Sequence, residues 1–311
     1  MSNEKMRGHV FILTANILFA VNIPVSKSLI PSHITPEGLT LLRIVFGCLM
    51  FWIASLFVPR EKVAPKDLVL LFLCAVCGIA FNQSLFMEGL NLTSPVDASI
   101  IATAGPVYVM LLAALILKEP ITGQKAFGVL LGVVGAVTLI LSSSQAGSHE
   151  GGLAGNLRIV CSNLLYSVYI VLSRPLSRRY SAVTIMKWMF LFSVAMLIPF
   201  TYRSILEAPA FHRETLDWSE MGAIAYVLLL GTFIPYLIIP MSLRRLRPTT
   251  VSMYNYIQPI IASIIAIVLG QGVFTPWKAL STLLVFTGVY LVTQSKSRED
   301  VEREKQSGPV A

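Results

Sequence analysis

Polar side chains recur at helical spacing within an otherwise apolar stretch, residues 248–270. They stand at i, i+3, i+4, i+7 and i+11 and share one helix face: Ser252, Asn255, Tyr256, Pro259 and Ser263. A proline in mid-helix frees backbone carbonyls, which inside a membrane need a partner or a water-filled cavity. The stripe is therefore typical of a helix that lines a polar path.

A related pattern occurs in residues 95–117, where Ser99, Thr103 and Pro106 take equivalent places. Paired interruptions in two apolar helices are the best pointer in a sequence to a transporter's binding site. We therefore predict hinges at Pro106 and Pro259, with polar residues of both helices around a substrate.

Other apolar segments add polar residues that could converge on the same place. A single residue of this kind more often joins two helices, at about 0.6 kcal/mol, than binds a ligand. As a set they favour a cavity. The predicted substrate-binding residues are Asn16, Asn82, Gln83, Ser99, Thr103, Asn163, Tyr166, Tyr236, Ser252, Asn255 and Tyr256.

Three ionisable residues fall inside apolar segments, where a charge costs roughly 2.5–3.5 kcal/mol: Lys27, Arg43 and Glu88. Lys27 is either part of a coupling site or extends its amine to the membrane surface. Arg43 stays charged and needs an acceptor, and Glu88 lies at a similar depth. We predict that these two lie close together. If they pair, Glu88 is a poor proton carrier, and if they do not, proton coupling by Glu88 becomes plausible.

Motifs for other chemistry are absent from the sequence. It contains no G-x-x-x-x-G-K-[ST] nucleotide loop, no H-E-x-x-H and no G-x-S-x-G, and its four histidines are scattered. The four cysteines lie in apolar segments and are interpreted as small packing residues. We expect no enzymatic activity, no metal and no cofactor.

The composition is that of an integral membrane protein. Hydrophobic residues make up 55% of the chain and charged residues only 13%, against roughly 25% charged residues in soluble domains. The net charge of +8 comes from basic residues in short loops and is accompanied by no nucleic-acid motif, so no nucleic-acid partner is expected.

Ten segments are long enough to cross a hydrocarbon core, which requires about 20 apolar residues. The predicted spans are 8–30, 37–58, 67–90, 95–117, 123–141, 153–173, 181–201, 219–243, 248–270 and 275–294. We therefore expect an all-α membrane protein with ten transmembrane helices in the lipid bilayer.

Basic residues predict how these spans are oriented. Seventeen lysines and arginines lie in the termini and one set of alternate loops, whereas the opposite loops hold only Arg203 and Arg213. Short loops rich in basic residues stay cytoplasmic. Both termini are therefore predicted to be cytoplasmic, in a multi-pass protein of the cytoplasmic membrane.

The chain also contains an internal repeat. Residues 95–140 overlay residues 248–293 without a gap at an offset of 153, which pairs Pro106 with Pro259. Residues 8–27 overlay 155–174 in the same way, and Arg43 meets Lys187. Because five helices is an odd number, the second copy must enter the membrane inverted, as in many secondary transporters. The predicted units are 1–145, 146–295 and a disordered tail, 296–311.

Glycines in 123–141 form a face of small residues that permits close approach of another helix: Gly128, Gly132 and Gly135. The approaching helix belongs either to the same chain or to a second copy in a homodimer.

On several short motifs the chain resembles the EamA family of the drug/metabolite transporter superfamily. They are Ala20–Lys27, Leu42-Arg43, Thr93–Ile100 leading to Pro106, and Leu117-Lys-Glu119. The chain departs from the family at Gly270-Gln271-Gly272 and at Ala20-Val21. The resemblance implies a secondary transporter of a small organic solute, such as an amino acid, metabolite or drug-like compound, with export favoured. The alternative is a channel-like protein or a membrane enzyme of unrecognised type.

Overall fold

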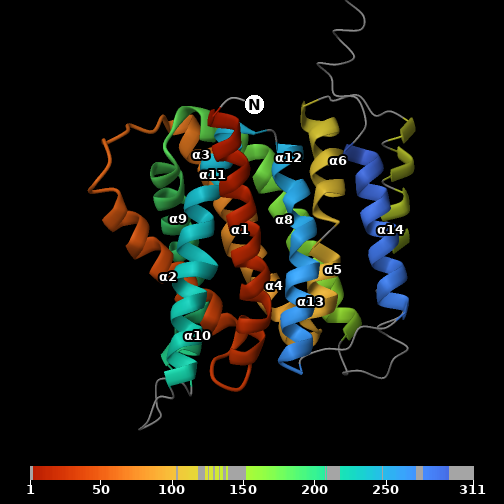
Figure 1. The fold of residues 1–311 in the computed structure, drawn as a ribbon. Helices are drawn as coiled ribbons and strands as arrows, with labels where there is room; N and C mark the ends of the chain where they lie inside the picture. The colour runs from red at the N-terminus through yellow and green to blue at the C-terminus, as the bar shows by residue number, and fades with distance from the viewer. Residues whose placement is uncertain are drawn as a thin grey trace, which may run out of the picture.

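The computed structural model describes residues 3–102, 104–117, 123–124, 126–128, 130–132, 134–135, 138, 152–206, 208, 218–246, 248–270 and 276–293. Every regular element within these residues is a helix, and the helices form a bundle whose long axes run between two ends (Figure 1). The predicted tail, 296–311, lies outside the described residues.

Within residues 3–117 the chain forms four stretches of helix, and the described residues between 123 and 138 are also helical. The four stretches are α1 (Asn3–Leu29), α2 (Pro36–Ala54), a continuous run of α3 (Pro65–Ala75), the π-helix η1 (Val76–Ala80) and α4 (Phe81–Leu92), and then α5 (Pro95–Ala102) followed by α6 (Gly105–Leu117).

The second half repeats this order. It contains α8 (Gly152–Arg179), α9 (Ala182–Leu206), a continuous run of α10 (Trp218–Leu228), the π-helix η3 (Leu229–Phe233) and α11 (Ile234–Arg245), then α12 (Pro248–Met253), the 3₁₀-helix η4 (Tyr254–Tyr256) and α13 (Ile257–Val268), and finally α14 (Pro276–Thr293).

Seven helices among the described residues are long and apolar enough to cross a membrane. They confirm seven of the ten predicted spans: Glu4–Leu29, Pro36–Ala54, Pro65–Leu92, Pro95–Ile116, Gly152–Arg179, Ala182–Leu206 and Trp218–Arg245. The other three predicted spans, 123–141, 248–270 and 275–294, are not confirmed. Of these, 123–141 and 275–294 fall partly outside the described residues, and 248–270 is divided into α12, η4 and α13.

Prolines begin many of these helices. The ring presets the backbone dihedral of the first turn, where the missing N–H has no partner to lose. Pro36, Pro65, Pro95, Pro248 and Pro276 each stand first in a helix. At α2 the preceding Thr35 also caps the helix, because its Oγ1 accepts the N–H of Gly38 at 3.1 Å.

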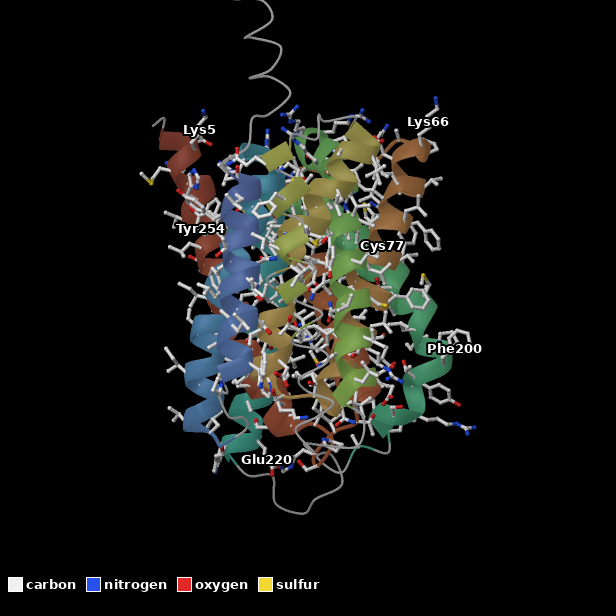
Figure 2. The ribbon with its side chains drawn as sticks, turned by 90° about the vertical axis from the view of Figure 1, so that its right-hand side faces the viewer. Lys5, Lys66, Cys77, Phe200, Glu220 and Tyr254 are labelled. Carbon is white, nitrogen blue, oxygen red and sulfur yellow. The ribbon has the colours of Figure 1, made fainter. Side chains whose placement is uncertain are left out.

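The two halves have opposite directions in the bundle. In Figure 1, α1 runs away from the end that holds the N-terminus, whereas its repeat counterpart α8 runs toward that end. Each of these two helices packs on helices of the other half: α1 lies against α11 and α13, and α8 lies against α4 and α6. Lys5 and Lys66 lie at one end of the molecule, and Glu220 lies at the other (Figure 2).

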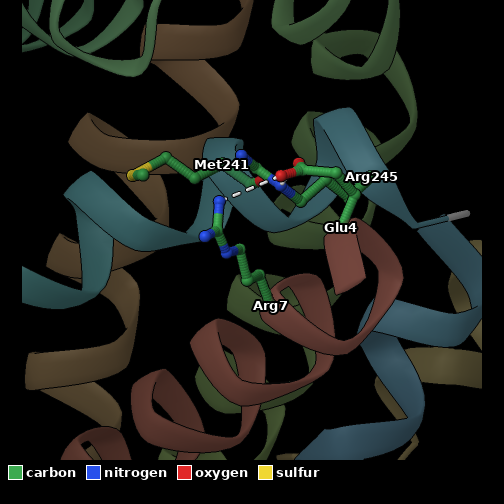
Figure 3. A network of polar contacts seen from close by, with 4 residues as sticks. All are labelled: Glu4, Arg7, Met241 and Arg245. Carbon is green, nitrogen blue, oxygen red and sulfur yellow. Dashed lines mark hydrogen bonds and ion pairs between the residues drawn. The ribbon is translucent and has the colours of Figure 1, made fainter. Parts of the chain in front are cut away.

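Ion pairs join helices at both ends. At the end that holds Lys5, Glu4 of α1 accepts from Arg7 at 3.1 Å and from Arg245 of α11 at 2.8 Å (Figure 3). At the opposite end, Arg158 of α8 lies 3.3 Å from Glu88 of α4.

The helices that carry Pro106 and Pro259 both change geometry before the proline. In the first, α5 ends at Ala102 and α6 begins at Gly105, immediately before Pro106. In the second, the 3₁₀ turn Tyr254–Tyr256 separates α12 from α13. The interruptions precede the two prolines, which themselves lie in the first turn of α6 and of α13, and the hinges at Pro106 and Pro259 stay a prediction.

The glycine face of 123–141 contacts the last helix of the same chain. A Cβ added at Gly288 of α14 would meet the carbonyl oxygen of Gly128 and, at 2.7 Å, the nitrogen of Gly132. The face could contact a helix of the same chain or a helix of a second copy, and the structure shows the contact within the chain.

Candidate functional site

A cavity of about 90 Å³ lies between helices of both halves. Its size leaves room for several water molecules, at roughly 10–15 Å³ each. The described lining residues are Phe19, Asn22, Ile23, Arg43, Asn82, Gln83, Phe86, Ala102, Asn163, Tyr166, Tyr236, Asn255 and Gln258.

Seven lining residues were predicted from the sequence. Six are substrate-binding candidates and the seventh is the cation: Asn82, Gln83, Asn163, Tyr166, Tyr236, Asn255 and Arg43. The sequence reasoning missed six others, of which Asn22 and Gln258 are polar. Gln258 follows Asn255 by three residues, so the helical spacing that identified Asn255 could also have identified it.

A smaller cavity of about 20 Å³ continues from the first and contains two more candidates, Asn16 and Ser252. The cavities share four lining residues, Phe19, Tyr166, Asn255 and Gln258. The amide of Gln258 donates to Asn16 Oδ1 at 2.7 Å, which joins α13 to α1 between the two spaces.

The remaining candidates lie elsewhere or outside the description. Ser99 is buried, and its hydroxyl donates to the carbonyl of Val96 in its own helix rather than facing either cavity. Thr103 and the side chains of Tyr256 and Pro259 lie outside the described residues.

Arg43 has partners other than Glu88. Its Nε donates to Thr232 Oγ1 at 2.8 Å, and its Nη2 donates to the carbonyl oxygen of Gly231 at 3.1 Å. Both acceptors belong to η3, where a π-helix shifts the backbone hydrogen bonds by one residue. Since Glu88 pairs with Arg158, the predicted contact between Arg43 and Glu88 is replaced by two separate interactions.

Lys27 caps a neighbouring helix. Its Nζ donates to the carbonyl oxygens of Leu90 and Asn91, at 2.7 and 2.9 Å. The last carbonyls of a helix lack partners within that helix and carry partial negative charge, which suits an ammonium group. Lys27 therefore joins α1 to the end of α4, a structural role that requires no bound ion.

Tyr236 forms a second polar contact with a π-helix. Its hydroxyl accepts from Gln83 Nε2 at 3.1 Å and donates to the carbonyl oxygen of Gly78 in η1 at 3.2 Å. All three residues are buried, and Gln83 and Tyr236 line the cavity.

Two asparagines of the site differ in their hydrogen bonding. Asn82 donates to both the carbonyl and the hydroxyl of Ser162, at 2.9 Å each, and so joins α4 to α8. In contrast, the buried Nδ2 of Asn163 has no hydrogen-bond partner among the described residues. Asn163 therefore has a donor available at the cavity.

No group of three or more His, Cys, Asp or Glu side chains within the described part of the chain could hold a metal ion. The described lining combines one cation, Arg43, with neutral polar, aromatic and aliphatic side chains.

Comparison with known proteins identifies the family. The sequence profile of the EamA-like transporter family matches residues 6–141 and again residues 153–294. The uncharacterized transporter YetK of Bacillus subtilis is 23% identical over 96% of this chain and 90% of its own length. The WAT1-related protein At3g53210 of Arabidopsis thaliana is 25% identical over 91% of this chain and 81% of its own length.

A crystal structure of a protein with 19% sequence identity shares the fold. It superimposes with a TM-score of 0.66 and covers 93% of this chain and 98% of its own. With two matching repeats, several apolar helices that can cross a membrane, and bacterial and archaeal relatives named as transporters, the chain belongs to the EamA-like transporter family and is a multi-pass membrane protein.

Proposed function

We propose that the protein is a secondary transporter that carries a small organic solute out of the cell across the cytoplasmic membrane by alternating access. The observation that carries this proposal is the position of the cavity. Residues of α1, α2 and α4 from the first repeat and of α8, α11 and α13 from the second line it together. A site shared by two inverted units is exposed to either side when one unit rocks against the other.

In this proposal ten helices span the membrane and both termini are cytoplasmic. The end that carries Lys5 and Lys66 then faces the cytoplasm and the end with Glu220 faces outward, in agreement with the distribution of basic residues. A reporter fused at the C-terminus would test the orientation, and a signal from the outer side would contradict it.

The interrupted helices are the proposed hinges. Both interruptions lie next to cavity residues, since Ala102 ends α5 and Asn255 belongs to η4. A change of backbone angles at these two points would move the half-helices around the solute without unfolding either one.

Counterflow in proteoliposomes tests the function. A carrier loaded with unlabelled solute accumulates labelled solute from outside, whereas a channel equilibrates it and an enzyme transforms it. Asn255→Leu removes a polar group from both cavities, so we expect at least a tenfold loss of exchange, comparable to one lost hydrogen bond of about 1.4 kcal/mol.

Thr287→Val is the matched control, because its exposed hydroxyl donates only to Leu283 of the same helix at 2.8 Å. It should retain both exchange and melting temperature. If Asn255→Leu exchanges solute as fast as the native protein, the cavity is not the path.

A further inference from the structure

Arg43 is a buried cation whose partners in the structure are uncharged. Its residue surface is only 3% exposed. The hydroxyl of Thr232 and the carbonyl of Gly231 accept from two of its three nitrogens, and within the described residues the third, Nη1, has no hydrogen bond. Arg carries five N–H donors, so most of its hydrogen-bonding capacity remains available.

No carboxylate among the described lining residues balances this charge. The nearest acid expected from the sequence, Glu88, is bound to Arg158. Asp97 is buried in α5 but does not line the cavity. Because burying an unpaired charge is costly, a membrane protein that keeps one beside a cavity gains most when an anion enters.

The bonds to η3 also hold the guanidinium in place. Thr232 Oγ1 is itself fixed, since it donates to the carbonyl of Val227 at 2.8 Å. A planar guanidinium held on one edge leaves its opposite donors for a planar, two-oxygen acceptor, the geometry in which arginine binds carboxylates.

The rest of the cavity suits the remainder of such a solute. Phe19, Phe86 and Tyr166 provide aromatic surface, and Asn163 provides a further amide donor. The lining therefore combines one cationic point with neutral polar and aromatic groups.

We propose that Arg43 binds the carboxylate of the transported solute, which is a small organic acid or amino acid with an apolar or aromatic body. This inference rests on the proposed transport function and narrows its substrate class.

Matched pairs of solutes test it by counterflow into liposomes that contain the purified native protein, with protein-free liposomes to measure leakage. Each pair differs only at the carboxylate: L-phenylalanine with L-phenylalaninamide, N-acetyl-L-phenylalanine with its amide, and phenylacetate with phenylacetamide. We expect the carboxylate of at least one pair to exchange roughly 10- to 100-fold faster than its amide, as for one charge-assisted hydrogen bond.

Variants test whether Arg43 is responsible. Arg43→Gln should lose the preference for the carboxylate by a similar factor, and Arg43→Lys should retain part of it. Lys187→Gln is the matched control, because Lys187 is the repeat counterpart of Arg43 but lies 5.4 Å from the centre of the Trp52 ring and does not line the cavity. It should leave the preference unchanged.

The outcomes distinguish a wrong substrate class from a wrong transport function. Faster exchange of the neutral or cationic member of the pairs would overturn the substrate class and leave transport standing. Exchange of no member would contradict both. The native protein alone decides these outcomes, so the test holds even if Arg43→Gln fails to fold.

Discussion

The two π-helices occupy equivalent places in the two repeats. Val76–Ala80 and Leu229–Phe233 each contain five residues and interrupt a long helix at the same point. Their starting positions differ by 153 residues, the offset that also relates Pro106 to Pro259. Each has a glycine at its centre, Gly78 in one and Gly231 in the other. The repeats therefore share an unusual backbone feature beside the cavity.

The side chains that bind these two π-helices differ. The carbonyl of Gly231 accepts from the charged Arg43, whereas the carbonyl of Gly78 accepts from the neutral hydroxyl of Tyr236. Lys187, the counterpart of Arg43, lies over Trp52 instead. The shared backbone thus supports a cationic contact in one half only, which makes the cavity asymmetric although the fold is repeated.

The helices packed on the two glycines also differ. A Cβ at Gly78 would meet Cγ and Cβ of Tyr169 at 2.5 and 2.9 Å, and Tyr169 is fully buried. A Cβ at Gly231 would meet the amide end of Asn22, which lines the cavity. One glycine faces a fixed ring and the other faces a side chain with space to move.

The largest effect is therefore expected from Gly78→Ala. The ring of Tyr169 is close to its own backbone and cannot move aside, so the extra methyl group should destabilise the protein by about 1–3 kcal/mol. Gly231→Ala should cost clearly less, because Asn22 can rotate toward the cavity. Thermal unfolding of the purified variants in detergent measures both.

Gly222→Ala is the control for these substitutions. Gly222 lies in α10, and a Cβ there would meet nothing within 4 Å. Helix propensity alone should then make it neutral or stabilising by up to about 1 kcal/mol. A Gly231→Ala protein that is less stable than Gly78→Ala would contradict the proposed difference between the two halves.

A comparable effect is expected when the hydroxyl of Thr232 is removed, and a smaller one when that of Tyr236 is removed. Thr232→Val removes the acceptor of a cation, and hydrogen bonds to charged groups contribute about 1.5–3 kcal/mol. Tyr236→Phe removes two neutral bonds, which in membrane proteins average about 0.6 kcal/mol each. Thr232→Val should therefore lower the melting temperature more than Tyr236→Phe does.

Transport measurements on the same two variants test whether the cationic side of the cavity has a special role. Thr232→Val loosens Arg43 and should reduce carboxylate exchange, whereas Tyr236→Phe leaves Arg43 and its acceptors intact. Equal losses of exchange in the two variants would mean that the cationic side of the cavity has no special role.

Much of this architecture could be predicted from the sequence, because hydrophobic length and repeated prolines are visible in it. Seven spans were confirmed in this way, and the polar stripe identified Asn255 correctly as a cavity residue. The π-helices were missed, because hydropathy does not respond to one extra residue in a helical turn. Extending the offset of 153 backward from Pro95 would have paired Gly78 with Gly231 and Gln83 with Tyr236.

The contact expected between Arg43 and Glu88 shows a second limit. Similar depth in the membrane made the pair plausible, but depth does not specify which way a side chain points around its helix. One of the two acceptors that Arg43 uses is a backbone carbonyl of η3, which no side-chain pattern in the sequence records. Only the packing of α2 beside η3 makes this partner available.

The ion pairs at the two ends extend the comparison of the repeats and should give the smallest effects. At one end the acid is on α1 and the base on α11, as Glu4 and Arg245; at the other the base is on α8 and the acid on α4, as Arg158 and Glu88. Ion pairs that water and salt can reach contribute little to stability. Glu4→Gln and Glu88→Gln should therefore change the melting temperature little.

Glu88→Gln also decides whether Glu88 carries protons. The Glu88 side chain is 36% exposed, lies 3.3 Å from the guanidinium of Arg158 and is not among the described residues that line the cavity. A side chain paired outside the cavity lining makes no contact with a solute held in the cavity, so we do not expect it to couple the solute to protons. We expect Glu88→Gln to change the rate of solute exchange less than about twofold, the factor that corresponds to about 0.4 kcal/mol.

The dependence of solute exchange on pH, from pH 5 to 8, should be the same in Glu88→Gln, in Glu4→Gln and in the native protein. If Glu88→Gln alone abolishes the pH dependence while exchange continues, then Glu88 couples transport to protons and the two end pairs are not equivalent.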